Sequence, residues 1–241
     1  MLWRKEKLRF FLGSHKKREF RVFVSQIFIP QKGQVTLLSG NPTPITFGVD
    51  GIPRSYYGAA VPFGEVDIAA NYRILFQRTV AGVSDLPNPI KKLLFTDVDV
   101  QIVCSPFIKD FVLPEKPFVA FGSPAYNASS DWIQNNLNPR IRFTRDNSGI
   151  EVELDNGKKY TTKRHNNCFV SRMLRENGVP VFYVAGLNER ATVCAAMFLL
   201  KEWASICSRG ARYDNISYLI EFSFDNPHEY DSIECIRYYH H

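Results

Sequence analysis

The segments Phe118–Asn127 (FVAFGSPAYN) and Val181–Thr192 (VFYVAGLNERAT) decide the fold class. Each begins with aromatic, β-branched and small apolar residues, which are typical of a buried strand. Each then passes through a glycine into polar residues that can begin a helix. Two strand–turn–helix junctions of this kind predict an α/β domain. In such domains, ligands bind in a crevice beyond the carboxyl ends of the strands.

The first junction offers three candidate ligand-binding residues, Gly122, Ser123 and Asn127. Gly122 lets the backbone approach a ligand closely. Ser123 and Asn127 add a hydroxyl and an amide beside the backbone N–H groups of a helix start, where anions bind. The alternative is a tight turn in which Ser123 or Asn127 only caps the helix. No GxGxxG or Walker loop is present to decide between them.

The second junction offers Gly186, Arg190 and Thr192 as ligand-binding residues and Glu189 as a catalytic residue. Arg190 can bind a phosphate or carboxylate in a bidentate way, and Thr192 can donate to the same anion. Glu189 can act as an acid/base or accept a hydrogen bond from a ribose hydroxyl. The alternative is that Asn188 caps the helix while Glu189 and Arg190 face solvent.

Asp67 is a second candidate catalytic carboxylate. It lies with Glu65 at the start of a helix expected to run from about 65 to 81, after a stretch rich in Pro and Gly. There it can face the same crevice as the two junctions. Acidic residues also stabilise the first turn of a helix through its dipole, and that role needs no ligand.

Basic charge is concentrated at the N-terminus. Residues 1–19 hold seven of the 30 Lys and Arg and two of the 24 Asp and Glu, which gives +5 there and +1 for residues 20–241. This distribution argues against nucleic acid as a partner of the whole surface. We expect residues 1–19 to form a basic N-terminal arm that docks on a protein partner or a second copy. We expect the arm to contribute little to the folding of the core.

Cysteine and histidine usage indicates a reduced cytoplasmic protein without a metal site. The five cysteines are scattered and no pair has CxxC spacing, so we expect reduced thiols in the core. The histidines His15, His165 and His228 have no acidic or Cys neighbour at ligand spacing. No apolar run is long enough to span a membrane, and no secretory signal or common hydrolase motif is present.

The two junctions resemble those of Rossmann-like nucleotide-binding domains, the group that includes the SLOG domains, the TIR domains and the nucleoside deoxyribosyltransferases. The resemblance covers roughly residues 20–210 and is carried by Gly122-Ser123-Pro124-x-x-Asn127 and by Gly186 with Thr192 before an Ala-rich helix. It implies nucleotide or NAD-derived ligands, and in some members cleavage of N-glycosidic bonds by a glutamate. The glycine-rich loop of the best-known SLOG proteins is absent here, and no glutamate matches a catalytic one.

We therefore expect a single α/β domain over 20–241, a Rossmann-like three-layer sandwich with a mainly parallel sheet. An antiparallel hairpin is expected at 150–162, because Asn156-Gly157 supplies the backbone angles of a tight turn. Two final strands should extend an edge of the sheet. The other expected strands lie at 20–29, 99–104, 117–121, 140–144, 168–174 and 181–185, and the other helices at 131–137 and 189–207.

The leading functional hypothesis is the binding or sensing of a small anionic ligand, a nucleotide or NAD-derived molecule. The first alternative is an enzyme that cleaves the N-glycosidic bond of a nucleoside or nucleotide, with Glu189 or Asp67 as the acid/base. The second alternative is a protein-interaction scaffold that holds no ligand. No cofactor is implied by the sequence.

Overall fold

The computed structural model describes residues 2–13, 19–25, 27–29, 46–47, 53–54, 58–60, 62–76, 98–105, 111–146, 149–161, 167–210, 215–222 and 230–238. Four helices are described: α1 (Leu2–Leu12), α2 (Phe63–Phe76), α4 (Ala128–Asn136) and α5 (Glu189–Gly210). The histidines considered above and most of the Pro- and Gly-rich stretch at 30–61 lie outside the described residues. Among the described helices, none is long and apolar enough to cross a membrane.

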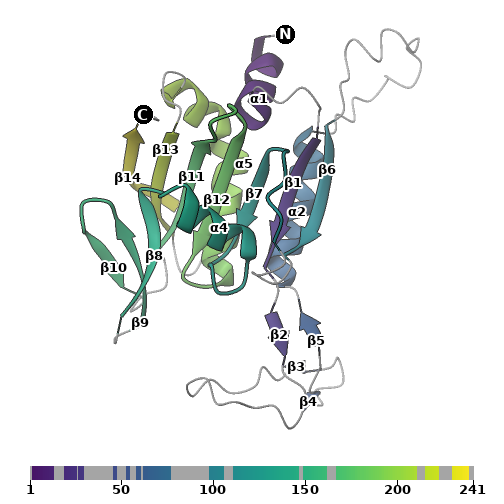
Figure 1. The fold of residues 1–241 in the computed structure, drawn as a ribbon, viewed down its shortest axis with the longest axis vertical. Helices are drawn as coiled ribbons and strands as arrows, with labels where there is room; N and C mark the ends of the chain where they lie inside the picture. Colours follow the sequence, from purple (N-terminus) through teal and green to yellow (C-terminus); the bar gives the residue numbers. More distant parts are fainter. Residues whose placement is uncertain are drawn as a thin grey trace.

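Seven strands form the central sheet in the order β14-β13-β11-β12-β7-β1-β6 (Figure 1). The strands β6, β1, β7 and β12 run parallel, and β11, β13 and β14 follow with antiparallel pairing, so five of the seven point the same way. The predicted α/β class, the mainly parallel sheet and the final edge pair are confirmed. The strand bounds are β1 Glu19–Val24, β6 Asp99–Cys104, β7 Phe118–Phe121, β11 Asn167–Leu174, β12 Pro180–Gly186, β13 Asn215–Phe222 and β14 Tyr230–Tyr238.

Both faces of this sheet are covered. On one face, α1, α2 and α5 pack against alternate strand residues such as Val22, Phe121 and Val184. On the other face lie α4 and the small sheet of β8 (Ile141–Asp146), β9 (Gly149–Leu154) and β10 (Lys159–Thr161), against residues such as Phe118 and Tyr183. Figure 1 shows α2 and α5 behind the sheet and α4 in front of it. Since strand side chains alternate between faces, the all-buried strands β7 and β12 serve both cores.

The predicted hairpin is confirmed. The strands β9 and β10 pair antiparallel, with Lys159 opposite Glu153. Between them, Leu154 N–H donates to the Lys158 carbonyl over 2.9 Å, and Gly157 has a φ of +81°. A glycine adopts that angle without the cost that a Cβ would add.

The expected strand at 20–29 is wrong in one respect: it is interrupted at Ser25. The strand β1 ends at Val24, and β2 (Ile27–Ile29) pairs instead with β5 (Gly58–Ala60) outside the central sheet. Two two-stranded sheets are described beyond this edge, the other joining β3 (Thr46–Phe47) to β4 (Pro53–Arg54). The run of apolar residues hides the break because it continues on both sides of Ser25.

Burial of α1 contradicts the expectation that the basic arm contributes little to the core. Phe10, Phe11 and Leu12 are at most 5% exposed. The Phe11 ring lies 5.3 Å from the Phe182 ring and 5.9 Å from the Phe20 ring, between centroids. The apolar residues of this basic helix therefore belong to the same core as the sheet. Docking of its basic side on a partner stays a prediction.

We expect Phe11→Ala to lower the free energy of unfolding by about 3–5 kcal/mol, because it removes a fully buried ring from a packed core. Urea unfolding followed by circular dichroism measures the loss. The control is Arg9→Ala on the exposed side of the same helix, which should change stability by about 0.5 kcal/mol or less. Equal stability of Phe11→Ala and wild type would contradict a structural role for α1.

Candidate functional site

The carboxyl ends of three parallel strands meet at one point. Gly122 N–H, just after β7, donates to the Val184 carbonyl of β12 over 3.0 Å. Ser25 Oγ, just after β1, donates to the Phe121 carbonyl of β7 over 3.1 Å. Polar side chains reach this point from the first turns of α2 and α5 and from Asn127 before α4. This is the end of the sheet at which the sequence predicts a crevice.

The Glu65 side chain of α2 contacts Ser25 at this point, and only 2% of the residue is exposed. Its Oε2 accepts from Ser25 N over 2.6 Å, and its Oε1 lies 3.0 Å from Ser25 Oγ. One carboxyl group therefore takes both the backbone and the side-chain donor of Ser25. That contact ties the start of α2 to the end of β1 and explains why the strand breaks there.

The surroundings of the Glu65 carboxyl group favour its protonated form. Burial raises its pKa from 4.5 to about 7, although the two hydrogen bonds from Ser25 act in the opposite direction and the nearby Glu189 carboxylate adds a smaller increase. The hydrogen-bond geometry agrees. Ser25 has one hydroxyl hydrogen but faces two acceptors, Glu65 Oε1 and the Phe121 carbonyl. A protonated Glu65 can donate to Ser25 Oγ, so that the Ser25 hydrogen serves Phe121.

Gly122 is required by this packing. Its φ is +79°, and a Cβ at this position would lie 2.3 Å from Ser25 Oγ and 3.1 Å from Glu65 Oε1. Gly157 in the hairpin has nearly the same φ, but a Cβ there would meet nothing within 4 Å. The absence of a side chain at Gly122 thus lets the backbone approach a carboxyl of this chain.

Glu189 brings a second carboxylate to the same place. Its Oε1 accepts from Gly64 N over 2.7 Å, at the amino end of α2, where unpaired N–H groups and the helix dipole favour an anion. A Cβ on Gly64 would lie 2.9 Å from this oxygen. Glu189 and Glu65 thus meet around the first turn of α2. The Glu189 side chain remains exposed on its other side.

At the second strand–turn–helix junction, the other candidate residues form hydrogen bonds within the junction itself. Thr192 Oγ1 accepts from Gly186 N over 3.2 Å and donates to the Asn188 carbonyl over 3.1 Å. Asn188 Oδ1 accepts from Ala191 N over 2.8 Å, which caps α5. A Cβ on Gly186 would lie 2.3 Å from that of Ala191. Thr192 and Gly186 are therefore occupied by internal contacts, and Arg190 lies exposed beside them.

At the first strand–turn–helix junction, too, the candidate residues form hydrogen bonds within the chain. Asn127 is buried, with Nδ2 donating to the carbonyls of Phe23 and Phe121 over 3.0 and 2.8 Å. Its Oδ1 accepts from Ser129 N, which is the capping interpretation of this residue and begins α4 three residues before the expected start. The Ser123 carbonyl accepts from Asn127 N, and the Ser123 side chain is half-buried.

Asp67 does not share the position of Glu65. Successive helical residues turn by about 100°, so a side chain two residues on projects about 200° away. Asp67 is exposed, whereas Glu65 is buried. Sequence reasoning missed Glu65 as a site residue, although a signal was present: Glu65, Ile68, Ala69 and Tyr72 follow the spacing of one helical face, and the last three are apolar.

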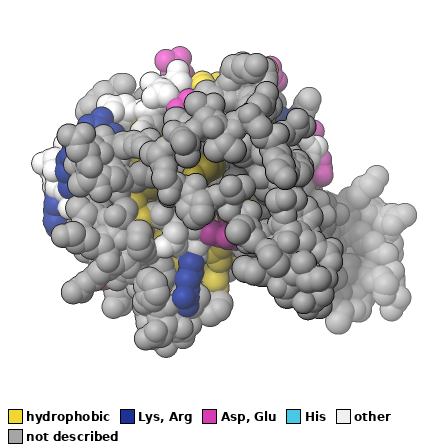
Figure 2. All heavy atoms as spheres, turned by 90° about the horizontal axis from the view of Figure 1, so that it is seen from below, with side chains coloured by type: hydrophobic (Ala, Val, Ile, Leu, Met, Phe, Trp, Pro, Cys, Tyr) yellow, Lys and Arg dark blue, Asp and Glu magenta, His cyan; other side chains and the backbone are white. Residues whose placement is uncertain are grey.

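Viewed from this end of the sheet, acidic, basic and apolar side-chain atoms lie close together (Figure 2). Within the described part of the chain, no cluster of three or more His, Cys, Asp or Glu is arranged to hold a metal ion. The chain matches no protein-family model, no curated protein and no solved structure.

The Glu65 carboxyl should make stability depend on pH. Between about pH 4.5 and 7 the folded protein keeps the Glu65 proton and the unfolded chain has lost it. The unfolded state then binds fewer protons, so the free energy of unfolding falls as the pH rises through this window. The fall attributable to Glu65 is about 3 kcal/mol at most. In Glu65→Gln, which stays neutral, this part of the fall should disappear.

Urea unfolding from about pH 5 to about pH 8 measures this effect. Asp67→Asn is the matched control, because it removes an exposed carboxylate from the same helix turn. Asp67→Asn should keep the wild-type slope of stability against pH. A wild-type slope in Glu65→Gln would show that Glu65 carries no proton in this window.

Proposed function

We propose that the protein binds or senses a small nucleotide-type ligand in the crevice where the carboxyl ends of β1, β7 and β12 meet the first turns of α2 and α5. The observation that carries the proposal is the meeting of Glu65 and Glu189 at this point, one buried and one exposed. Titratable groups with a shifted pKa in a crevice are typical of functional sites. Helices on both faces of a mainly parallel sheet support a Rossmann-like three-layer architecture, which we also propose.

The charges suggest how such a ligand is oriented. Glu189 already occupies the anion position at the amino end of α2. A phosphate there would meet a carboxylate, and like charges repel. Sugar hydroxyls, in contrast, can donate to Glu189. Arg190, exposed in the first turn of α5, then supplies the cation for a phosphate or carboxylate at the rim.

Binding is tested by thermal unfolding of the whole chain with NAD, ADP-ribose and cyclic nucleotides. A ligand at about one hundred times its Kd should stabilise the protein by about 3 kcal/mol. Gly122→Ala should lose this stabilisation, because its Cβ displaces Ser25 Oγ or Glu65. Arg190→Ala should bind phosphate-bearing ligands more weakly, by a factor of about 10 or more.

Two matched controls accompany these variants. Gly157→Ala carries the same backbone strain away from the crevice, and Arg142→Ala removes an exposed arginine from β8. Both should bind like wild type. If no member of the ligand set stabilises the protein, nucleotide binding is refuted and the interpretation as a ligand-free scaffold gains.

A second candidate function is hydrolysis of an N-glycosidic bond. It is favoured by two neighbouring carboxyl groups in different environments, since such pairs often divide the roles of acid and base. Glu189, the more exposed of the two, is the residue we assign as acid/base: it takes a proton from the water that attacks the sugar carbon. The C–N bond breaks with its electron pair going to the nucleobase nitrogen, and Glu189 delivers to that nitrogen the proton it took from the water. Asp67, exposed on α2, is the alternative.

Glu189→Gln should abolish release of base from a nucleoside or nucleotide while the ligand still binds, because Gln can accept a hydrogen bond but not a proton. Chromatography of the products measures release, and thermal unfolding measures binding. Glu202→Gln is the control from the same helix. Unchanged turnover in Glu189→Gln would reject the assignment, and Asp67→Asn then tests the alternative.

A further inference from the structure

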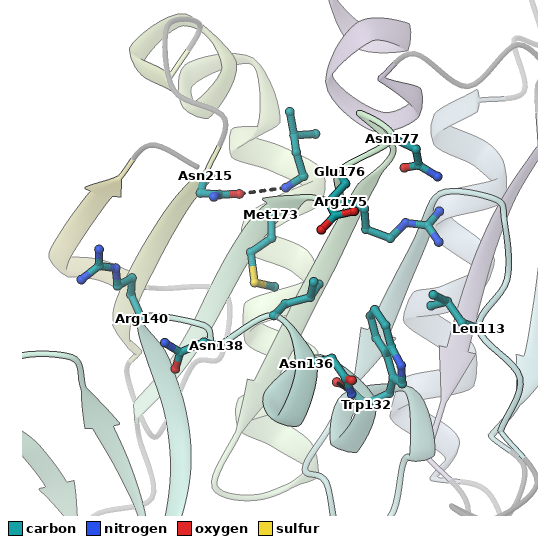
Figure 3. Close-up of a pocket in the computed structure, with 12 residues that line it drawn as sticks. Leu113, Trp132, Asn136, Asn138, Arg140, Met173, Arg175, Glu176, Asn177 and Asn215 are labelled. Atoms are coloured by element: carbon teal, nitrogen blue, oxygen red, sulfur yellow. Dashed lines mark hydrogen bonds between the residues drawn. The ribbon is translucent and has the colours of Figure 1, made fainter. Parts of the chain in front are cut away.

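A hollow of about 670 Å³ opens at the opposite edge of the sheet, by the end of β11 and the start of β12. It lies between the C-terminal turn of α4, the turn at 175–179 and the start of β13 (Figure 3). Its volume falls in the range typical of small-molecule sites, 300–1,000 Å³. No residue of the candidate crevice lines it.

One side of the hollow is apolar. Met173 forms part of it and is 2% exposed, while Leu113, Trp132 and Leu137 are half-buried and pack against the core with their other sides. In Figure 3 the flat face of Trp132 and the Met173 side chain flank the same space. An aromatic ring beside such a surface can stack on the indole.

The other side carries a fixed cation. Arg175 is 8% exposed, and its guanidinium donates to the carbonyls of Pro114 and Glu115 over 2.7 and 2.8 Å. These bonds hold the side chain in one place. Its Nε is covered by neighbouring atoms and has no hydrogen-bond partner among the described residues. Arg175 therefore contributes positive charge beside the hollow.

Two asparagines at the hollow have fixed amide orientations. Asn215 is 5% exposed, and its Oδ1 accepts from Leu174 N over 2.8 Å, which orients the amide and leaves the Nδ2 hydrogens as its donors. Asn136 Nδ2 donates one hydrogen to the Trp132 carbonyl over 2.8 Å, which leaves its Oδ1 and its second Nδ2 hydrogen for a ligand. The hollow thus combines a stacking surface with amides that can both donate and accept hydrogen bonds.

We propose that this hollow binds a nucleobase: a neutral, planar heteroaromatic ring that stacks on Trp132 and forms hydrogen bonds with the amides of Asn215 and Asn136. Stacking between a base and an aromatic side chain supplies affinity for any base, and amide groups read its edge. The proposal is independent of the function proposed above, because it concerns the other edge of the sheet.

The test uses the full chain labelled with ¹³C at its methionine methyl groups. The chain has three methionines. Met173 lines the hollow, and Met197 on α5 lies at the core on the other face of the sheet, where it serves as an internal control. Adenosine and inosine are the probes, and ribose is the base-free control. Both nucleosides should shift the Met173 signal and leave the Met197 signal in place, and ribose should shift neither.

Variants locate the binding. Trp132→Leu should weaken nucleoside binding about 5- to 100-fold, the range expected for one lost stacking contact. Asn136→Ala should also weaken it, whereas Asn135→Ala, which removes an exposed amide from the same helix turn outside the hollow, should not. Gly122→Ala, at the other edge, should leave the Met173 shift unchanged.

Three results would overturn the proposal. The first is a Met173 signal that stays in place up to the solubility limit of both nucleosides. The second is a shift that Trp132→Leu leaves unaltered. The third is loss of the Met173 shift in folded Gly122→Ala, which would assign nucleoside binding to the candidate crevice and so separate the two proposals.

Discussion

A buried carboxyl group, with no cation beside it among the described residues, holds the carboxyl edge of this sheet together. Glu65 reaches from α2 to the N–H and the hydroxyl of Ser25, and Ser25 reaches on to the Phe121 carbonyl. Three elements that are distant in sequence are joined by these two side chains. Burial of a charged carboxylate is costly unless it is paired, so the group is better accommodated as the neutral acid. The contacts that join α2 to the end of β1 therefore depend on the protonation of Glu65.

At the same end of the sheet, the Glu189 carboxylate of this chain occupies the anion position at the amino end of α2. In many α/β proteins the amino end of a helix is where a phosphate binds. Here Glu189 of α5 accepts from Gly64 at the amino end of α2, and Asn188 caps α5 itself. The chain therefore fills these two N–H groups, of Gly64 and Ala191, with its own side chains. Under the proposed function, this favours hydroxyl recognition at the glutamates over direct phosphate binding there.

Much of the architecture could be predicted from patterns that one segment carries alone. The strands β7 and β12 are recognisable because they are wholly apolar, and the β9–β10 turn because Asn156-Gly157 requires a tight hairpin. The break at Ser25 was not predictable in this way. It depends on a partner forty residues away, and nothing within the apolar run at 20–29 marks it.

The candidate site shows the same difference between patterns within one segment and contacts with residues distant in sequence. The sequence predicts Gly122 and Gly186 as ligand-binding residues, and the atoms that a side chain would meet at these positions belong to Ser25 and Ala191 of this chain. A glycine after a strand indicates a close approach but does not identify the approaching group. The acidic residues of the first turn of α2 predict equally well a role for Asp67 and for Glu65 until the helical face is considered. Burial of Ile68 and Tyr72 puts Glu65 on the inner face.

Proton loss from Glu65 would change more than one contact. Above a pH of about 7 its carboxylate and that of Glu189 would both be charged at the first turn of α2. Ser25 Oγ, with a single hydrogen, would then have to serve either Glu65 or the Phe121 carbonyl. An ionised acceptor forms the stronger hydrogen bond, so the Phe121 carbonyl would keep only its bond from Asn127 Nδ2. The link from Ser25 to β7 would weaken at this end of the sheet. Under the proposed function, a ligand bound at this end of the sheet would respond to the charge of Glu65.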